Sequence, residues 1–204
     1  LGRASGILPK DQIIPGEKLV MGSSVKVYVS KLEIGPKGPF IMLSRSHYGF
    51  VKRLLEIEIP ELSDGTVMLY SVARDAGSRT KIAVYTEYNN VDPIGAVIGE
   101  KGRRIASVLK ELGGEKIDVV LYDKDPAKFI ANALSPAKNV KVTIKDENKK
   151  EALAVVGDNN LSLAIGKRGQ NVKLASRLTH YKIEVKSQSA VNEENAEEVE
   201  ASEK

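Results

Sequence analysis

The sequence AVIGEKGRRI at residues 96–105 has a counterpart, LAIGKRGQNV, at residues 163–172. Each stretch holds a Gly-x-x-Gly loop, with an isoleucine directly before the first glycine and a branched apolar residue three positions after the second. The first glycine lets the backbone reverse sharply at the end of one helix, and the second begins the next helix without a Cβ that would block close approach. The sequence therefore predicts the same joint between two helices at two places in the chain.

The sequence around the two loops is repeated as well. Hydrophobic periodicity predicts the order helix, two strands, two helices and strand over residues 47–123, and the same order over residues 124–186. Placing Gly99 on Gly166 also aligns the last strands of the two units after a one-residue gap. A match over several elements indicates that one α/β unit is present twice, in tandem.

The two ends of the chain differ from this repeated part. Residues 1–46 contain three stretches typical of strands, GILP, SSVKVYVSKLEI and FIMLSRS, with GPKGP as a turn between the last two. Because three strands make a poor closed domain, we expect further strands of this sheet upstream of Leu1. Residues 187–204 have no apolar period and are rich in Glu, Ser, Asn and Ala, which predicts a disordered tail.

Charge is distributed unevenly along the chain. The 204 residues have a net charge of +4, but the last eighteen hold six Glu and one Lys, so that residues 1–186 carry +9. A basic body attracts polyanions, of which nucleic acid is the most common. The absence of Cys excludes disulfides and thiolate catalysis. We find no stretch of eighteen apolar residues and no secretory signal in the sequence, so we expect a soluble cytoplasmic protein without membrane contact.

Both loops have the features of a phosphate-binding site. The helix that follows each loop presents free backbone N–H groups and the positive end of its dipole. The nearby cationic side chains are Lys101, Arg103 and Arg104 at the first loop, and Lys167, Arg168 and Lys173 at the second. The apolar floor on which the helices are expected to pack consists of Ile98, Ile105, Ile165 and Val172.

A single Gly-x-x-Gly is often a simple joint between helices, but the duplication, the basic residues and the repeated α/β frame favour a ligand site here. A Walker A loop requires Gly-x-x-x-x-Gly-Lys-Ser/Thr, whereas Lys167 is followed by Arg168, and Leu161 stands where the first glycine is required. This spacing excludes nucleotide hydrolysis. Glu100 and Lys101 cancel in charge, whereas Lys167 and Arg168 add to +2, so we expect the second loop to contribute more of the salt-dependent affinity.

The stretches VIGEKGRRI and AIGKRGQNV resemble the signature of K-homology (KH) domains, and the helix-first order resembles the type II form of that domain. Further stretches, DQIIPGEKL, GSRTKIAVY, GEKIDVV and DPAKFIANALSPA, resemble the NusA family of bacterial transcription elongation, termination and antitermination factors. The resemblance covers nearly all of residues 1–186. It implies an α+β multidomain chain with an incomplete S1-like OB-fold domain at 1–46, tandem type II KH domains at 47–123 and 124–186, and the acidic disordered tail at 187–204.

The family resemblance also implies a function. KH domains clamp about four single-stranded nucleotides with this loop, so we expect the pair to bind nascent single-stranded RNA for a factor that modulates RNA polymerase pausing, termination and antitermination. Polymerase contact is expected of the full-length protein, because the polymerase-binding domain of the family is missing from this sequence. The implied RNA-binding residues are Ile98, Gly99, Glu100, Lys101, Gly102, Arg103, Arg104 and Ile105, and Ile165, Gly166, Lys167, Arg168, Gly169, Gln170, Asn171, Val172 and Lys173.

Nothing in the sequence points to catalysis. His47 and His180 lie in different units, and without Cys they make no convincing metal site, so we expect no enzyme activity, metal or cofactor. Tyr28, Phe40, Arg45 and His47 are candidates for an OB-fold nucleic-acid face, although Tyr28 and Phe40 suit a core equally well and Arg45 suits a solvated strand end. Aromatic residues make up only 5% of the chain, so we expect apolar grooves and hydrogen bonds, rather than stacking, to recognise bases.

Other classes of protein stay open on the sequence. The chain could be an RNA-binding accessory region of an exoribonuclease, but such enzymes carry a single KH domain ahead of the OB domain. It could also be a ribosomal structural protein or a protein-docking module, but the ribosomal protein with this domain carries one copy and long basic extensions. We expect the chain to be a monomer.

Overall fold

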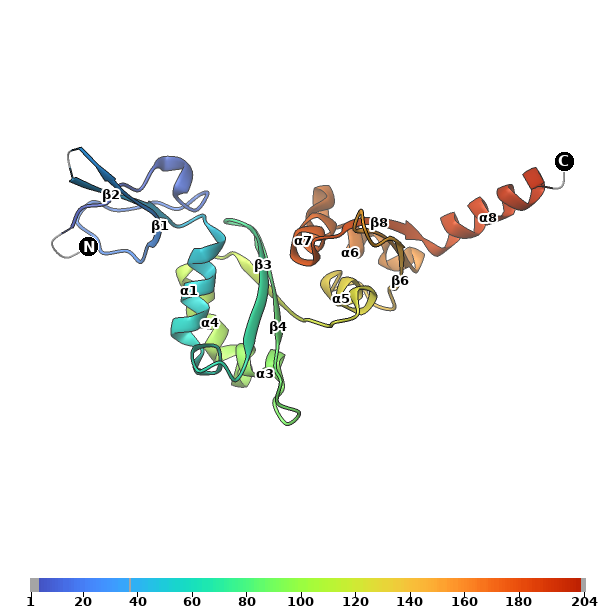
Figure 1. The fold of residues 1–204 in the computed structure, drawn as a ribbon, viewed down its shortest axis with the longest axis horizontal. Helices are drawn as coiled ribbons and strands as arrows, with labels where there is room; N and C mark the ends of the chain where they lie inside the picture. Colours follow the sequence, from blue (N-terminus) through green and yellow to red (C-terminus); the bar gives the residue numbers. More distant parts are fainter. Residues whose placement is uncertain (1–3, 37, 203–204) are drawn as a thin grey trace.

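The computed structural model describes residues 4–36 and 38–202. These residues form an N-terminal β segment, two α/β units and a C-terminal helix, arranged one after another along an elongated molecule (Figure 1). The order of helices and strands predicted for both units is confirmed.

The first unit is a three-stranded sheet with its helices on one face. Its elements are α1 (Tyr48–Glu58), α2 (Pro60–Ser63), β3 (Met68–Asp75), β4 (Arg79–Tyr85), α3 (Pro93–Ile98), α4 (Arg103–Glu111) and β5 (Lys116–Leu121). The strand order is β3-β4-β5, with β3 antiparallel and β5 parallel to β4. Pro60 ends α1, as its sequence predicts, and also begins the short helix α2, where its missing N–H costs nothing.

The second unit repeats this topology. Its elements are α5 (Pro126–Ala133), β6 (Lys141–Asp146), β7 (Glu151–Val156), α6 (Leu161–Ile165), α7 (Gln170–Thr179) and β8 (Lys182–Ser187). The strand order is β6-β7-β8, again with an antiparallel and a parallel pair. The Asp125 side chain caps α5 by accepting a hydrogen bond from the Ala127 N–H at 2.9 Å, and Pro126 stands at the first helical position.

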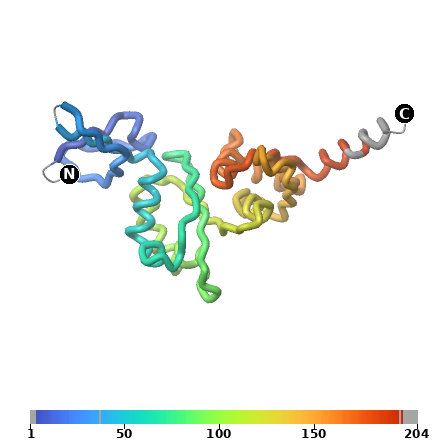
Figure 2. The backbone as a smooth tube through the Cα atoms, in the orientation of Figure 1, coloured from blue at the N-terminus to red at the C-terminus, as the bar shows by residue number. Residues whose placement is uncertain are grey.

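The sheet of the first unit is covered on both faces. On one face Ile82 and Val84 of β4 belong to a core that includes residues of α1 and α4. On the other face Ala73, Ala83 and Val120 belong to the core of the second unit, and α7 packs on β3 and β4. The two alanines allow the helix to approach the strands closely. One cluster of buried apolar residues therefore spans both units, beside the separate core of the first unit, and the units pack side by side (Figure 2).

Buried polar contacts also join the units. The Lys81 ammonium, which is fully buried, contacts Asp118 Oδ2 at 2.9 Å and donates to the Ser135 carbonyl of the second unit at 2.7 Å. Burial lowers the pKa of Lys81, and the Asp118 carboxylate opposes this effect. Ser71 Oγ donates to the Leu178 carbonyl at 2.8 Å. These directional contacts set the position of the second unit on the first sheet.

The N-terminal segment contains a two-stranded sheet of β1 (Tyr28–Gly35) and β2 (Gly38–Ser44) and a short 3₁₀ helix at Lys10–Gln12. The predicted hairpin around GPKGP is present, although the first strand begins only at Tyr28. The GILP stretch contributes a single bridge, from Ile7 to Met42, rather than a third strand. The described residues thus do not by themselves form a closed barrel.

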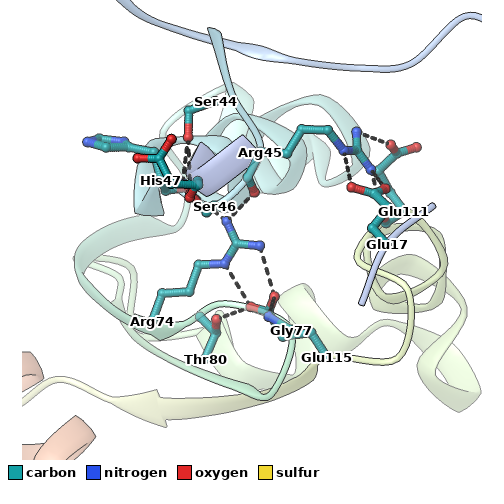
Figure 3. A network of polar contacts seen from close by, with 11 residues as sticks. Glu17, Ser44, Arg45, Ser46, His47, Arg74, Gly77, Thr80, Glu111 and Glu115 are labelled. Atoms are coloured by element: carbon teal, nitrogen blue, oxygen red, sulfur yellow. Dashed lines mark hydrogen bonds and ion pairs between the residues drawn. The ribbon is translucent and has the colours of Figure 1, made fainter. Parts of the chain in front are cut away.

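Two buried arginines fasten the N-terminal segment to the first unit (Figure 3). The Arg45 side chain is 3% exposed and pairs with Glu17 at 2.5 Å and Glu111 at 2.9 Å. Arg74 forms two hydrogen bonds with Glu115, at 2.9 and 2.8 Å, and donates to the backbone carbonyls of Arg45 and His47. The alternative of a solvated strand end for Arg45 is therefore wrong. Its guanidinium is buried and connects the N-terminal segment to Glu111 of the first unit.

His47 also has a structural role. Its Nδ1 accepts a hydrogen bond from the Gly49 N–H at 3.0 Å and caps the start of α1. Its ring stacks on Tyr28, with centroids 5.1 Å apart. Of the four candidates for an OB-fold nucleic-acid face, Phe40 is 40% exposed, whereas Arg45 is buried and His47 and Tyr28 contact each other.

The prediction of a disordered tail is wrong for residues 188–202. They form α8 (Gln188–Ser202), which continues from β8 at the end of the second unit (Figure 1). The Ser187 hydroxyl accepts a hydrogen bond from the Ala190 N–H at 3.2 Å at the start of the helix, and Lys186 pairs with Glu194 at 2.6 Å. Glu and Ala are good helix formers, so a composition low in apolar residues is here combined with high helix propensity.

Candidate nucleic-acid interface

The two Gly-x-x-Gly loops have nearly identical backbones. Gly99 has φ 72° and ψ 172°, and Gly166 has φ 74° and ψ 171°. Gly102 and Gly169 both have ψ 15°, with φ of 73° and 74°. Residues with a side chain rarely adopt a positive φ of this kind. The predicted joint between helices is confirmed at both places.

A cationic residue in each loop also lies in the left-handed region. Lys101 has φ 52° and ψ 27°, and Arg168 has φ 54° and ψ 28°. For a residue that is not glycine this conformation costs about 1–2 kcal/mol. Both side chains are exposed. The repeat thus preserves the same backbone conformation at the same cationic position of both loops.

Directly beneath the loops, two equivalent residues hold the preceding helix. A Cβ on Gly99 would lie 2.6 Å from Arg104 Cγ, and one on Gly166 would lie 2.7 Å from Asn171 Cβ. Arg104 donates to the Ala96 carbonyl at 2.9 Å, and its counterpart Asn171 donates to the carbonyls of Leu134, Leu163 and Ala164 at 3.0–3.2 Å. Each glycine therefore leaves room for a side chain that ties two helices together.

These positions correct the role expected of two residues. Asn171 is 1% exposed, and its amide is used by backbone carbonyls, so its side chain supports the loop from below instead of facing a ligand. Arg104 pairs with Glu61 at 2.6 Å. That hydrogen bond lowers the pKa of the Glu61 carboxyl. The positive charge of Arg104 is thus largely neutralised within the first unit.

The other expected residues divide into an exposed charged set and an apolar floor. The exposed charged residues are Glu100, Lys101, Arg103, Lys167, Arg168 and Lys173. In the floor, Ile105 is 8% exposed and Val172 packs against the shared core, whereas Ile98 is 38% exposed and Ile165 is half-buried. Gln170 is neither, because its amide nitrogen donates to Asp75 Oδ2 at 2.6 Å and to Ser78 Oγ at 2.7 Å in the turn between β3 and β4.

An apolar groove lies beside the helix that precedes the first loop. Ile94 of α3 and residues Val119, Val120 and Leu121 of β5 form its first-unit side. The second unit supplies the rest, including Asn132 and Asn139. Such a groove, with a few amides among apolar side chains, suits the flat apolar faces and polar edges of nucleobases.

The structure reveals an aromatic cluster that sequence reasoning missed. Tyr70 and Tyr122 stack with centroids 3.8 Å apart, and Tyr85 and Phe129 lie around them. Tyr70 is 47% exposed. Tyr85 and Tyr122 end two neighbouring parallel strands. That arrangement was the available signal, because parallel strands bring their ends to the same edge of a sheet.

The described residues contain neither a candidate metal site nor a membrane-spanning helix. No group of three or more His, Asp or Glu side chains in that part of the chain is placed to hold a metal ion. None of the helices within residues 4–36 and 38–202 combines the length and apolar character that a membrane crossing requires.

The two α/β units with their paired loops define a protein with two KH domains in tandem. Models of a NusA-like first KH domain and a NusA-like second KH domain match residues 45–122 and 126–193. A protein of Halalkalibacterium halodurans named transcription termination/antitermination protein NusA is 50% identical over 193 residues, which are 95% of this chain. The chain belongs to the NusA family.

Other relatives with the same name support this assignment. The protein of Bacillus subtilis is 49% identical over 95% of this chain, and that of Thermus thermophilus is 48% identical over 90%. The matched residues make up 50%, 52% and 47% of the Halalkalibacterium, Bacillus and Thermus proteins, respectively. The chain thus spans about half the length of the curated relatives it matches.

Proposed function

We propose that this chain binds single-stranded RNA through its two Gly-x-x-Gly loops, as the RNA-binding region of a NusA-type factor that modulates pausing, termination and antitermination. The observation that carries the proposal is the duplicated loop. Two backbones of nearly the same conformation each present an exposed, left-handed cation, Lys101 or Arg168, beside the start of a helix. Such a helix start attracts phosphate.

The geometry supports separate binding positions for the phosphates and the bases of the RNA. The N–H groups at the starts of α4 and α7 and the exposed cations would contact the phosphates, and the apolar groove beside α3 would take bases. Because the two units share a core, binding at one loop holds the RNA close to the other, which raises the effective concentration for the second contact. The RNA must then match a fixed distance between the loops.

The finer domain assignment forms part of the proposal. Residues 4–46 would belong to an S1-like OB-fold domain, which the β1-β2 hairpin and its attachment through Arg45 support. The boundaries would be 1–46 for this domain, 47–123 and 124–186 for the type II KH domains, and 187–204 for an acidic extension. Contact with RNA polymerase would belong to other parts of the full-length protein. The chain would act as a cytoplasmic monomer without enzyme activity.

Fluorescence-anisotropy titration of short single-stranded RNAs tests the proposed function. The titrations include DNA of the same sequence and duplexes of both kinds as matched competitors. We expect single-stranded RNA to bind more tightly than duplex DNA. Equal binding of RNA and duplex DNA would instead indicate a nonspecific basic surface, and the loops would then be joints in a protein-docking module.

The two loops should differ in their response to salt. Replacing Lys167 and Arg168 by Ala should flatten the plot of log affinity against log salt concentration by about one unit or more, because each phosphate neutralised contributes roughly 0.7 for single strands. Lys101→Ala should flatten it less, because Glu100 already offsets that charge. Titrations at four salt concentrations measure both slopes. Equal changes from both variants would contradict the ranking.

A further inference from the structure

A cleft lies where the second loop meets the first unit. Asp75, the last residue of β3, and Ser78, in the turn that follows, line one side, and α7 with the second loop lines the other. We call this the junction cleft, and its full lining is Asp75, Ser78, Lys167, Arg168, Gln170, Lys173, Leu174 and Arg177. Its volume is about 460 Å³. The bonds of Gln170 to Asp75 and Ser78 cross it and hold its two sides together.

The junction cleft is strongly cationic. Its lining has four basic side chains and one carboxylate, a net charge of +3. Among the described side chains, none of these four cations lies within 4.0 Å of a carboxylate oxygen, although the chain forms many ion pairs elsewhere. Like charges brought together without a counter-charge repel one another, so an anion in the cleft would relieve the repulsion.

Two of these cations stand outside the loop itself. Lys173 and Arg177 are four residues apart on α7 and therefore lie on the same face of the helix. The first unit has only half of this pair, because Ala106 stands at the position of Lys173, whereas Lys110 stands at that of Arg177. The junction cleft thus contains a pair of cations, four residues apart, that is incomplete at the first loop.

The single carboxylate of the cleft, that of Asp75, provides a hydrogen-bond acceptor among the cations. A carboxylate weakens the binding of a phosphate, but it accepts hydrogen bonds from neutral hydroxyls. Asp75 and Ser78 are both exposed, and Oδ2 of Asp75 accepts a hydrogen bond from the side-chain amide of Gln170. The remaining lone pairs of Asp75 and the Ser78 hydroxyl are available to a group that both donates and accepts. The 2′-hydroxyl of ribose is such a group, and it lies next to a phosphate in RNA only.

We propose that the junction cleft binds one ribose-phosphate unit of RNA, with Lys173 and Arg177 at the phosphate and Asp75 and Ser78 at the 2′-hydroxyl. This inference rests on the proposed function. In this proposal the residues where the two units meet distinguish RNA from DNA, whereas the two loops bind only the phosphates.

Paired variants separate the two parts of the site. Arg177→Gln should weaken RNA and DNA alike and flatten the salt slope by about 0.7, the contribution of one phosphate. The double change Asp75→Ala and Ser78→Ala should reduce the preference for RNA over DNA by roughly fivefold, because hydrogen bonds to one hydroxyl are lost. Lys141→Gln, an exposed lysine on β6, is the control and should change neither quantity.

A deoxy scan of the RNA identifies the hydroxyl. Single 2′-deoxy substitutions along a bound RNA should weaken binding to the unaltered chain at one position, and that loss should vanish in the Asp75/Ser78 variant, as coupled groups require. Gln170→Ala removes the bond across the cleft but leaves the hydroxyl partners, so it should keep the positional effect. Thermal unfolding of each variant checks that the fold is retained.

The outcomes distinguish this inference from the proposed function. If RNA binds selectively but the deoxy effect is the same in the variant, the cleft does not read the hydroxyl and the inference fails alone. If Gln170→Ala abolishes the positional effect as fully as the double change, the residues merely brace the two units, and the inference again fails. If the unaltered chain does not bind single-stranded RNA at all, the proposed function itself is wrong.

Discussion

Changing Lys101 and Arg168 together to Asp should weaken binding of single-stranded RNA by at least about a hundredfold, because two cations beside bound phosphates become anions. Asp enters the left-handed region more readily than most residues, so the loop backbones should persist. Anisotropy titration measures the affinity, and circular dichroism checks the fold.

The chain offers a matched control for this double change. Lys150, in the turn between β6 and β7, is also an exposed lysine with a left-handed backbone, at φ 54°. Lys150→Asp combined with Lys141→Asp alters the net charge by the same amount outside the loops. This control should retain most of the affinity. If both double variants lose the same affinity, total charge rather than the loops governs binding, and the clamp is refuted.

Glu115→Ala should lower the free energy of unfolding by about 3–5 kcal/mol, the usual effect of removing one partner of a buried ion pair. Glu115 is fully buried, and its partner Arg74 is 2% exposed, so the change leaves a guanidinium charge without water or a carboxylate. The hydroxyl of Thr80 and the N–H of Gly77 lose the same acceptor. Urea unfolding followed by circular dichroism measures the loss.

A surface pair and a repacked pair serve as the comparisons. Glu184→Ala breaks the surface contacts of Glu184 with Lys145 and Lys186 and should cost less than about 1 kcal/mol. Replacing Arg74 and Glu115 together by Met and Leu should recover much of the loss, because no buried charge is then left unpaired. A loss for Glu115→Ala no larger than that for Glu184→Ala would show that the buried pair contributes little.

The repeated α/β order and both loops were predictable because local signals specify them. Positive φ at Gly99 and Gly166, the Asp125 cap and the strand periodicity each depend on a few neighbouring residues. Such signals can be recognised in short stretches of sequence. Here each signal occurs in both units, so the two copies support the same prediction.

The interior of the site was not predictable in the same way. Arg45 bonds to Glu111, which is 66 residues away in the sequence, and Gln170 bonds to Asp75, which is 95 residues away. No local sequence pattern predicts either of these partners. The family resemblance implied that Asn171 binds RNA, yet its side chain is buried beneath the loop. Such assignments depend on how units pack, which periodicity within one element does not encode.

The outer faces of the two sheets differ in the residues that they present. The first sheet offers Ala73 and Ala83 to the next unit. On β6 of the second sheet, Lys141, Thr143 and Lys145 are exposed at alternate positions. In an array of repeats, a unit with a polar outer face terminates the stack. On β6 the second unit thus carries polar residues where the first unit carries a small apolar contact residue, so the two copies are not interchangeable in this packing.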